Sequence, residues 1–219
     1  MKRNLDFNEI SDGKLYTSGD LAKVSCGGCV NCSECCEVTE DTILLDPYDI
    51  YELSRGLSQI FEKLMEDAVG LTVIDGVITP YLKKHEALKA CVFLSSDKRC
   101  LIHDFRPGFC RLFPLGRIYD EEGNFKYFIQ VHECPYPSKS KVKIEKWLGI
   151  KKLSQYEQFI REWHEISKNL SDCTLEDPAS PLAKKANMKL LNTFFVRPYD
   201  TEKDFYSQFA ERKKLYFDT

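Results

Sequence analysis

Five cysteines fall within the short stretch Cys26-Gly27-Gly28-Cys29-Val30-Asn31-Cys32-Ser33-Glu34-Cys35-Cys36. Successive thiols are mostly separated by two residues, a spacing that allows two sulfurs to bind one metal ion. The two glycines let the backbone turn around such an ion, including at positions that need a positive φ. A cysteine buried in an ordinary core gains nothing from this regularity. The stretch therefore predicts a metal site on irregular backbone.

A second group of cysteines follows along the chain, namely Cys91, Cys100, Cys110 and Cys134. The two groups contain all of the ten cysteines except Cys173, which fits better as a small apolar residue near a helix end. The first candidates for metal ligands are Cys29, Cys32, Cys36 and the four cysteines of the second group. Cys26 and Cys35 come next.

The composition is that of an ordinary packed protein. The chain has 219 residues, 43% of them hydrophobic, and a formal net charge of −3, so a folded core is expected. Without a basic excess, we expect no binding to nucleic acid. No apolar run reaches signal-peptide or membrane-spanning length, so we expect a cytoplasmic protein without membrane contact. In a reducing cytoplasm, clustered cysteines are expected to hold metal instead of forming disulfides.

Capping and turn residues predict short helices and hairpins around the cysteines. Asp46-Pro47 opens a helix that runs through about residue 54 and is ended by Gly56. Asp75-Gly76 supplies the positive φ values of a tight turn and predicts a hairpin over 71–79. The alternation of turn and apolar residues predicts another hairpin over 115–131.

The character of the chain changes after about residue 140. A helix that docks on the rest of the protein is predicted by apolar residues at helical spacing: Tyr156, Phe159, Ile160, Trp163, Ile166 and Leu170. A capping box at Thr201-Glu202-Lys203-Asp204 predicts a last helix. We therefore expect an α+β protein with two parts. Residues 1–140 form a small irregular metal-binding domain with short helices and β-hairpins, and residues 141–219 form a helical C-terminal extension.

Zinc and iron–sulfur clusters both take four thiolates. Cys26-x-x-Cys29-x-x-Cys32 with the remote Cys134-Pro135 has the form of a bacterial ferredoxin motif, which favours an iron–sulfur cluster, of the 4Fe-4S type, over zinc. The chain departs from that motif at the adjacent pair Cys35-Cys36. Neighbouring side chains point apart, so these two thiols serve different centres or only one of them is a ligand. One or two centres are expected, and zinc remains the alternative metal.

Basic residues accompany the second cysteine group. Arg106, Arg111 and Arg117 lie within a few residues of Cys110. Four thiolates around a divalent ion or a doubly charged cluster leave about two net negative charges, which buried guanidinium groups offset. The alternative is that the arginines bind an anionic substrate or the carboxylate of a nucleoside cofactor. His103 is a weaker candidate, as a ligand or as a hydrogen-bond donor beside one.

These residues resemble the YkgJ-type cysteine-cluster family, whose domain chelates zinc or iron. The resemblance covers about residues 20–137 and rests on Cys29-x-x-Cys32-x-x-Cys35-Cys36, Cys91, Cys100, Arg106-Pro107-x-x-Cys110-Arg111-x-Phe113-Pro114 and Cys134. The chain is similar to a subset of relatives that also carries Cys26, Leu45-Asp46-Pro47-Tyr48-Asp49 and Arg111-Leu112-Phe113-Pro114-Leu115-Gly116-Arg117. The family includes a flagellin lysine methylase, which implies an S-adenosylmethionine-dependent role as an alternative. Residues 141–219 carry no motif for that cofactor.

Three functions remain open. The leading hypothesis is a cytoplasmic metal-binding protein with one or two iron–sulfur or zinc centres, acting in electron transfer or metal handling. Its C-terminal helices would cover the site or receive a protein partner. The second is an iron–sulfur-dependent enzyme resembling flagellin lysine N-methylase. The third is a zinc-stapled interaction module, in which metal replaces a core that irregular segments cannot build.

Overall fold

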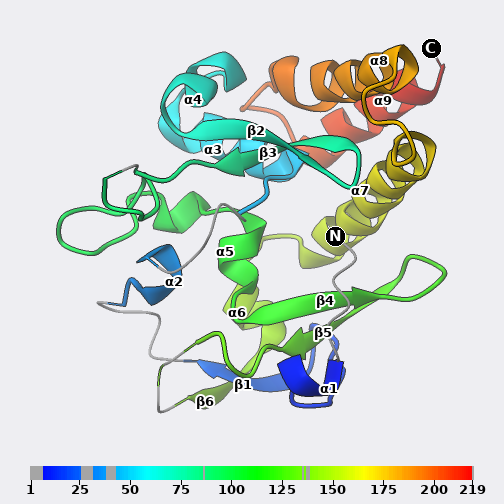
Figure 1. Ribbon diagram of the computed structural model, residues 1–219. Coiled ribbons are helices and arrows are strands. Elements are labelled where there is room, and N and C mark those ends of the chain that lie inside the picture. Colours follow the sequence, from blue (N-terminus) through cyan, green and yellow to red (C-terminus); the bar gives the residue numbers. More distant parts are fainter. Residues whose placement is uncertain are drawn as a thin grey trace.

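The computed structural model describes residues 7–25, 32–37, 43–85, 87–134, 136 and 139–218. It has the expected α+β fold, with three separate antiparallel sheets of two strands each among these residues. In Figure 1 the last helices lie together at the top of the view, and the sheet of the first strand lies at the bottom. No helix within the described part of the chain has the length and apolarity needed to cross a bilayer.

The first sheet joins two segments that are far apart in the sequence. Strand β1 (Leu21–Ser25) pairs antiparallel with β6 (Ser140–Lys143), and Ser25 lies opposite Ser140. Ala22 and Val24 of β1 are completely buried, as the two-residue period of a strand requires for its inner face. Because β1 leads into the first cysteine group and β6 follows Cys134, this sheet closes the two ends of the cysteine-rich region. Helix α1 (Phe7–Ile10) precedes it.

Helix α3 (Pro47–Leu57) begins as the sequence predicts but ends later. The Asp46 carboxylate accepts a hydrogen bond from the backbone amide of Asp49. The Asp49 carboxylate in turn accepts one from the backbone amide of Asp46, and the two bonds form a capping box. The predicted end at Gly56 is wrong, because the helix continues through that glycine. It ends where Ser58 takes a left-handed conformation with φ of 55°. Gly56 serves for close packing instead.

Both predicted hairpins are confirmed. Strands β2 (Val69–Ile74) and β3 (Val77–Leu82) join through Asp75 and Gly76, whose φ angles are 48° and 80°. Strands β4 (Leu115–Tyr119) and β5 (Phe125–Ile129) form the second hairpin. Five short helical segments lie between β1 and α7 in the described chain, in addition to α3: α2 (Glu34–Glu37), α4 (Phe61–Asp67), η1 (His103–Phe105), α5 (Gly108–Leu112) and α6 (Ile144–Leu148).

The predicted docking helix is α7 (Leu153–Thr174), drawn in yellow in Figure 1. Its apolar face is buried as expected, apart from the half-buried Trp163. Helix α8 (Pro181–Leu191) begins after its N-cap Ser180, continues into the π-helical turn η2 (Asn192–Val196), and is followed by α9 (Phe205–Asp218). Rings from α3, α7 and α9 meet in one aromatic core: Tyr48, Tyr156, Phe159, Phe205 and Phe209.

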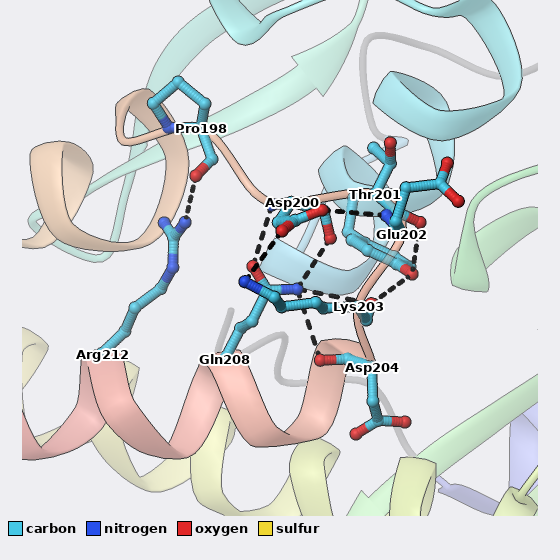
Figure 2. Close-up of polar contacts among 9 residues, drawn as sticks. Pro198, Asp200, Thr201, Glu202, Lys203, Asp204, Gln208 and Arg212 are labelled. Carbon is cyan, nitrogen blue, oxygen red and sulfur yellow. Dashed lines mark hydrogen bonds and ion pairs between the residues drawn. The ribbon is translucent and has the colours of Figure 1, made fainter.

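The last helix is capped differently from the prediction. Asp204, not Thr201, accepts the backbone amide that opens α9, through a bond of 3.1 Å from Ser207. Figure 2 shows the polar contacts that hold the preceding turn, in which the Gln208 side chain bonds the amide and carbonyl of Asp200. The capping motif is therefore shifted by three residues along the chain.

Candidate metal centre

Five of the predicted ligands lie on three segments that meet in the structure. Cys35 and Cys36 lie in α2, and Cys110 lies in α5. Cys91 and Cys100 lie on the irregular segment between β3 and η1. The backbone amide of Cys91 donates to the carbonyl of Cys36 at 3.0 Å, which ties that segment directly to α2.

Backbone bridges fix the two cysteines of the irregular segment. Cys91 forms an antiparallel bridge with Lys84, and Cys100 forms one with Leu94. The amide of Leu94 also donates to the carbonyl of Cys91 at 2.9 Å. The bridge between Leu94 and Cys100 is closed by bonds from the amide of Leu101 to Phe93 and from the amide of Ser95 to Arg99. Leu94 is thus bonded to Cys91 and paired with Cys100, which places the two cysteines in neighbouring turns of the backbone.

The thiols of Cys35 and Cys36 lie side by side, with 4.0 Å between their sulfur atoms. This contact raises the pKa of the Cys36 thiol far above its ordinary value, and burial and the charges of nearby thiols add to the effect. Cys91 and Cys100 are among those thiols. The two neighbouring side chains therefore face one shared environment, so a single centre could draw on either of them.

Burial also raises the pKa of the thiols of Cys91, Cys100 and Cys110. Charge on Cys35 adds to the rise at each of the three, so Cys35 lies near them all. Thiols held this way keep their protons in the metal-free protein. A cation placed among them would favour the thiolate and release those protons.

The chemistry of this donor set suits a soft metal. None of the described cysteines forms a disulfide. Thiolates are the ligands of structural zinc and of iron–sulfur clusters. In the described ranges, however, no three cysteine, histidine or acidic side chains converge closely enough to hold one ion. The thiols are gathered in one neighbourhood, and binding would require their sulfurs to draw together.

Three of the remaining five cysteines lie within the described residues, and two lie outside them. Cys32 is half-buried and comes just before α2. Cys134 follows β5, and its carbonyl accepts a bond of 2.8 Å from the Lys139 ammonium. Cys173 is exposed on α7. Cys26 and Cys29 lie outside the described residues.

Two of the predicted arginines lie close to the cysteines in sequence: Arg106 between Cys100 and Cys110, and Arg111 directly after Cys110 in α5. Burial raises the pKa of Cys100, and the positive charge of Arg106 opposes that rise, so Arg106 stands close to the thiol. Arg106 also donates to the carbonyl of His103 at 2.8 Å. Arg111 donates to the carbonyl of Arg106 at 3.0 Å and so braces this turn. Burial lowers the pKa of His103, with Arg106 adding to the effect, which favours a neutral imidazole.

Arg117 belongs to a different buried cluster. Its guanidinium donates to the Tyr156 hydroxyl at 3.3 Å, and its charge acts on the carboxylates of Asp46 and Asp49. Burial raises the pKa of Asp46 to about 6 and that of Asp49 well above its ordinary value, although Arg117 opposes both shifts. Sequence analysis named both acids in a motif and placed Asp46 at a helix start, but it predicted no charged cluster that contains them. The two motifs at 45–49 and 111–117 contain these residues. The sequence does not reveal that the two motifs lie close together in the fold.

A separate hollow of about 570 Å³ lies beside the first turn of α9 and is not lined by cysteine. Its charged side chains mostly bond within the hollow or to nearby backbone. Figure 2 shows Arg212, which is only 4% exposed, donating to the carbonyl of Pro198. Arg212 also donates to the carbonyls of Thr193 and Arg197. These contacts hold the turn between η2 and α9, so the hollow is part of a structural joint.

Comparison with known proteins points to the cysteine-rich part of the chain. Residues 28–135 match the family model CxxCxxCC, described as "Putative zinc- or iron-chelating domain". No curated protein and no solved structure matches the chain. The matched residues include all five of the gathered cysteines and the segment of Arg106 and Arg111. The family match therefore supports a zinc- or iron-chelating domain over residues 28–135.

Proposed function

We propose that this chain is a metal-binding protein whose main centre is held by Cys91, Cys100, Cys110 and one or both of Cys35 and Cys36. The observation that carries the proposal is that these thiols, from α2, the segment after β3, and α5, lie near enough for their charges to act on one another, and that the Cys91 amide bonds the Cys36 carbonyl. Three separate segments thus bring part-buried, reduced thiols into one neighbourhood. Cys26, Cys29, Cys32 and Cys134 stay predicted ligands of the same centre or of a second one.

The proposed metal group is an iron–sulfur cluster of the 4Fe-4S type, with zinc as the alternative. When bound, a cluster would supply one-electron chemistry, whereas zinc would supply a structural cross-link. The protein's own residues would exclude water from the sulfurs by burial and offset their charge through Arg106. A cytoplasmic role in electron transfer or metal handling follows from this proposal.

We also propose that the C-terminal helices receive a protein partner. Large apolar side chains remain exposed on two of them: Leu182 and Met188 on α8, and Leu215 and Phe217 on α9. Exposed apolar groups that lie together on a surface often mark contacts with another protein. Helix α7 instead buries its apolar face and attaches this region to the rest of the protein.

A zinc-stapled interaction module is the second candidate, and one observation favours it. The segment between β3 and η1 carries Cys91 and Cys100 but contains no helix or strand among its described residues. Isolated bridges and turns hold it instead. A metal cross-link would stabilise such a segment directly, because metal binding and folding share the same free energy.

The test is anaerobic purification followed by an absorption spectrum, with iron, zinc and sulfide measured on the same sample. Matched iron and sulfide in brown protein would support the cluster, and stoichiometric zinc in colourless protein would support the staple. Each gathered cysteine is then replaced by serine, with Cys173→Ser as the matched control on an exposed thiol. Metal content that stays at the wild-type level in every variant would refute the proposal.

A further inference from the structure

Asp49 connects the capping box of α3 to the helix that carries Cys110. Its side chain is inside the protein, with only 2% of the residue exposed. One carboxylate oxygen accepts the backbone amide of Gly108 at 2.7 Å, and the other accepts the amide of Asp46 at 3.0 Å. Both oxygens are therefore used for backbone bonds, one on each of two separate segments.

The bond to Gly108 fixes the start of α5. Gly108 is the first residue of that helix, and Cys110 follows two positions later within it. A side chain at Gly108 would collide with the Tyr156 hydroxyl, so the backbone is pressed against α7 at this point. Held by Asp49 on one side and limited by Tyr156 on the other, the first turn of α5 has little freedom to shift. The orientation of Cys110 depends on that turn.

The charge of Arg117 offsets only part of the cost of ionising Asp49, whose pKa burial raises well above its ordinary value. A carboxylate without a compensating charge is strongly disfavoured inside a protein. The charge of Arg117 favours the ionised forms of Asp46 and Asp49, and its guanidinium also bonds Tyr156. This cluster of acids, Arg117 and Tyr156 thus links α3, β4 and α7, and it contains no cysteine.

We propose that Asp49 is a positioning residue of the metal centre, which holds Cys110 toward Cys91 and Cys100 through the amide of Gly108. This inference rests on the proposed metal-binding function. Residues that orient ligands from behind typically change metal affinity about 10- to 100-fold when they are removed. Asp49 acts on the backbone of a ligand-bearing helix, so its loss would displace one thiol of the set.

The test uses Co²⁺ as the probe on the full chain, because its absorption bands report how many thiolates bind. Asp49→Ala is expected to weaken Co²⁺ binding about 10- to 100-fold and to reduce the sulfur-to-cobalt charge-transfer band. Asp49→Asn keeps an oxygen that can accept from Gly108 and should retain most of the affinity. Asp204→Ala, which removes a helix cap on α9 far from the cysteines in sequence, is the matched control and should bind Co²⁺ like the wild type.

The outcomes separate the two claims. A wild-type protein that gives no thiolate–cobalt spectrum and contains no iron or zinc would overturn the proposed function itself. A wild type that binds Co²⁺ while Asp49→Ala binds it equally well, with the same spectrum, would overturn only the role of Asp49. Should Asp49→Ala fail to fold, Asp49→Leu also removes the acceptor while filling the buried space, and the same affinity loss is expected.

Discussion

Gly56 of α3 lies directly against the ring of Phe105 in η1. A Cβ atom at Gly56 would come within 2.5 Å of that ring, closer than a real carbon contact allows. Phe105 stands on the segment between Cys100 and Cys110, so this contact sets how near α3 approaches the cysteines. Glycine inside a helix normally weakens it, and here the close approach gives the reason for its presence.

Gly56→Ala is therefore expected to destabilise the protein, although alanine favours helix formation. Overpacking of this kind costs about 1–3 kcal/mol, more than the roughly 1 kcal/mol that alanine returns in a helix. The free energy of unfolding in urea measures the change. Gly19→Ala is the matched control, because its Cβ would meet only a Thr17 oxygen at 4.0 Å. An alanine at 56 that leaves stability unchanged or raised would contradict the packing argument.

Metal binding is expected to weaken as the pH falls. Burial raises the pKa of Cys91, Cys100 and Cys110, so these thiols keep their protons at neutral pH until a metal displaces them. Protons then compete with the metal for the same sulfurs, and the competition grows stronger at lower pH. Titration with Zn²⁺ between about pH 6 and pH 8, with proton release measured in a weakly buffered solution, checks this. Binding that is independent of pH, without proton release, would exclude these thiols as ligands.

The parts of the fold set by local residues could be predicted from the sequence. Asp75-Gly76 specifies its turn because few residues adopt a positive φ easily, and Asp46-Pro47 specifies a helix start. The strand β1 was missed, because its partner β6 lies more than a hundred residues away and its alternation covers only two buried residues. The end of α3 was misplaced because Gly56 reads as a helix stop unless the ring of Phe105 is known to lie against it.

The site was predictable in its chemistry but not in its arrangement. Cysteine spacing predicts thiolate ligands, and the structure brings Cys35, Cys36, Cys91, Cys100 and Cys110 into one neighbourhood. Spacing could not assign Arg117 to a carboxylate pair, because that cluster depends on how α3, β4 and α7 pack together. Asp49 shows the same difficulty, because its side chain accepts a hydrogen bond from the amide of Gly108, which lies 59 positions later in the chain.

Replacement of Asp46 by asparagine is expected to flatten the dependence of stability on pH. Burial raises the pKa of Asp46 from 3.8 to about 6, so the folded protein favours the protonated acid. A group with a raised pKa in the folded state contributes stability below its unfolded pKa, and this contribution is lost as the pH rises through about 6. The shift corresponds to roughly 3 kcal/mol. Asparagine remains a good N-cap for α3.

Urea unfolding of the metal-free protein at about pH 4.5 and pH 7 measures this effect. Asp20→Asn is the control of opposite sign, because hydrogen bonds from Thr17 lower the pKa of the exposed Asp20. The stability contributed by Asp20 is present above its unfolded pKa and is lost as the pH falls. An Asp46→Asn protein with the same pH dependence as the wild type would show that Asp46 is not the responsible group.

Arg212 is expected to stabilise the C-terminal joint without affecting the metal centre. Its guanidinium donates to the carbonyls of Thr193, Arg197 and Pro198 at 2.9, 2.7 and 2.7 Å and lies 3.5 Å from the centre of the Tyr199 ring. Arg212→Met removes these donors and leaves part-buried carbonyls without them, which should lower the free energy of unfolding by roughly 2–4 kcal/mol. Arg212→Lys keeps one charged donor but not the planar fork, so its loss should be intermediate.

Urea denaturation followed by far-UV circular dichroism measures these losses, and Lys184→Met, on the exposed face of α8, is the matched control. Metal content is measured on the same samples and should equal that of the wild type in all three variants, because the three carbonyls belong to η2 and the turn that follows it. A stable Arg212→Met protein would show that the carbonyls find other partners. A stable fold with reduced metal content would instead show that the C-terminal joint acts on the cysteines, which the contacts of Arg212 give no reason to expect.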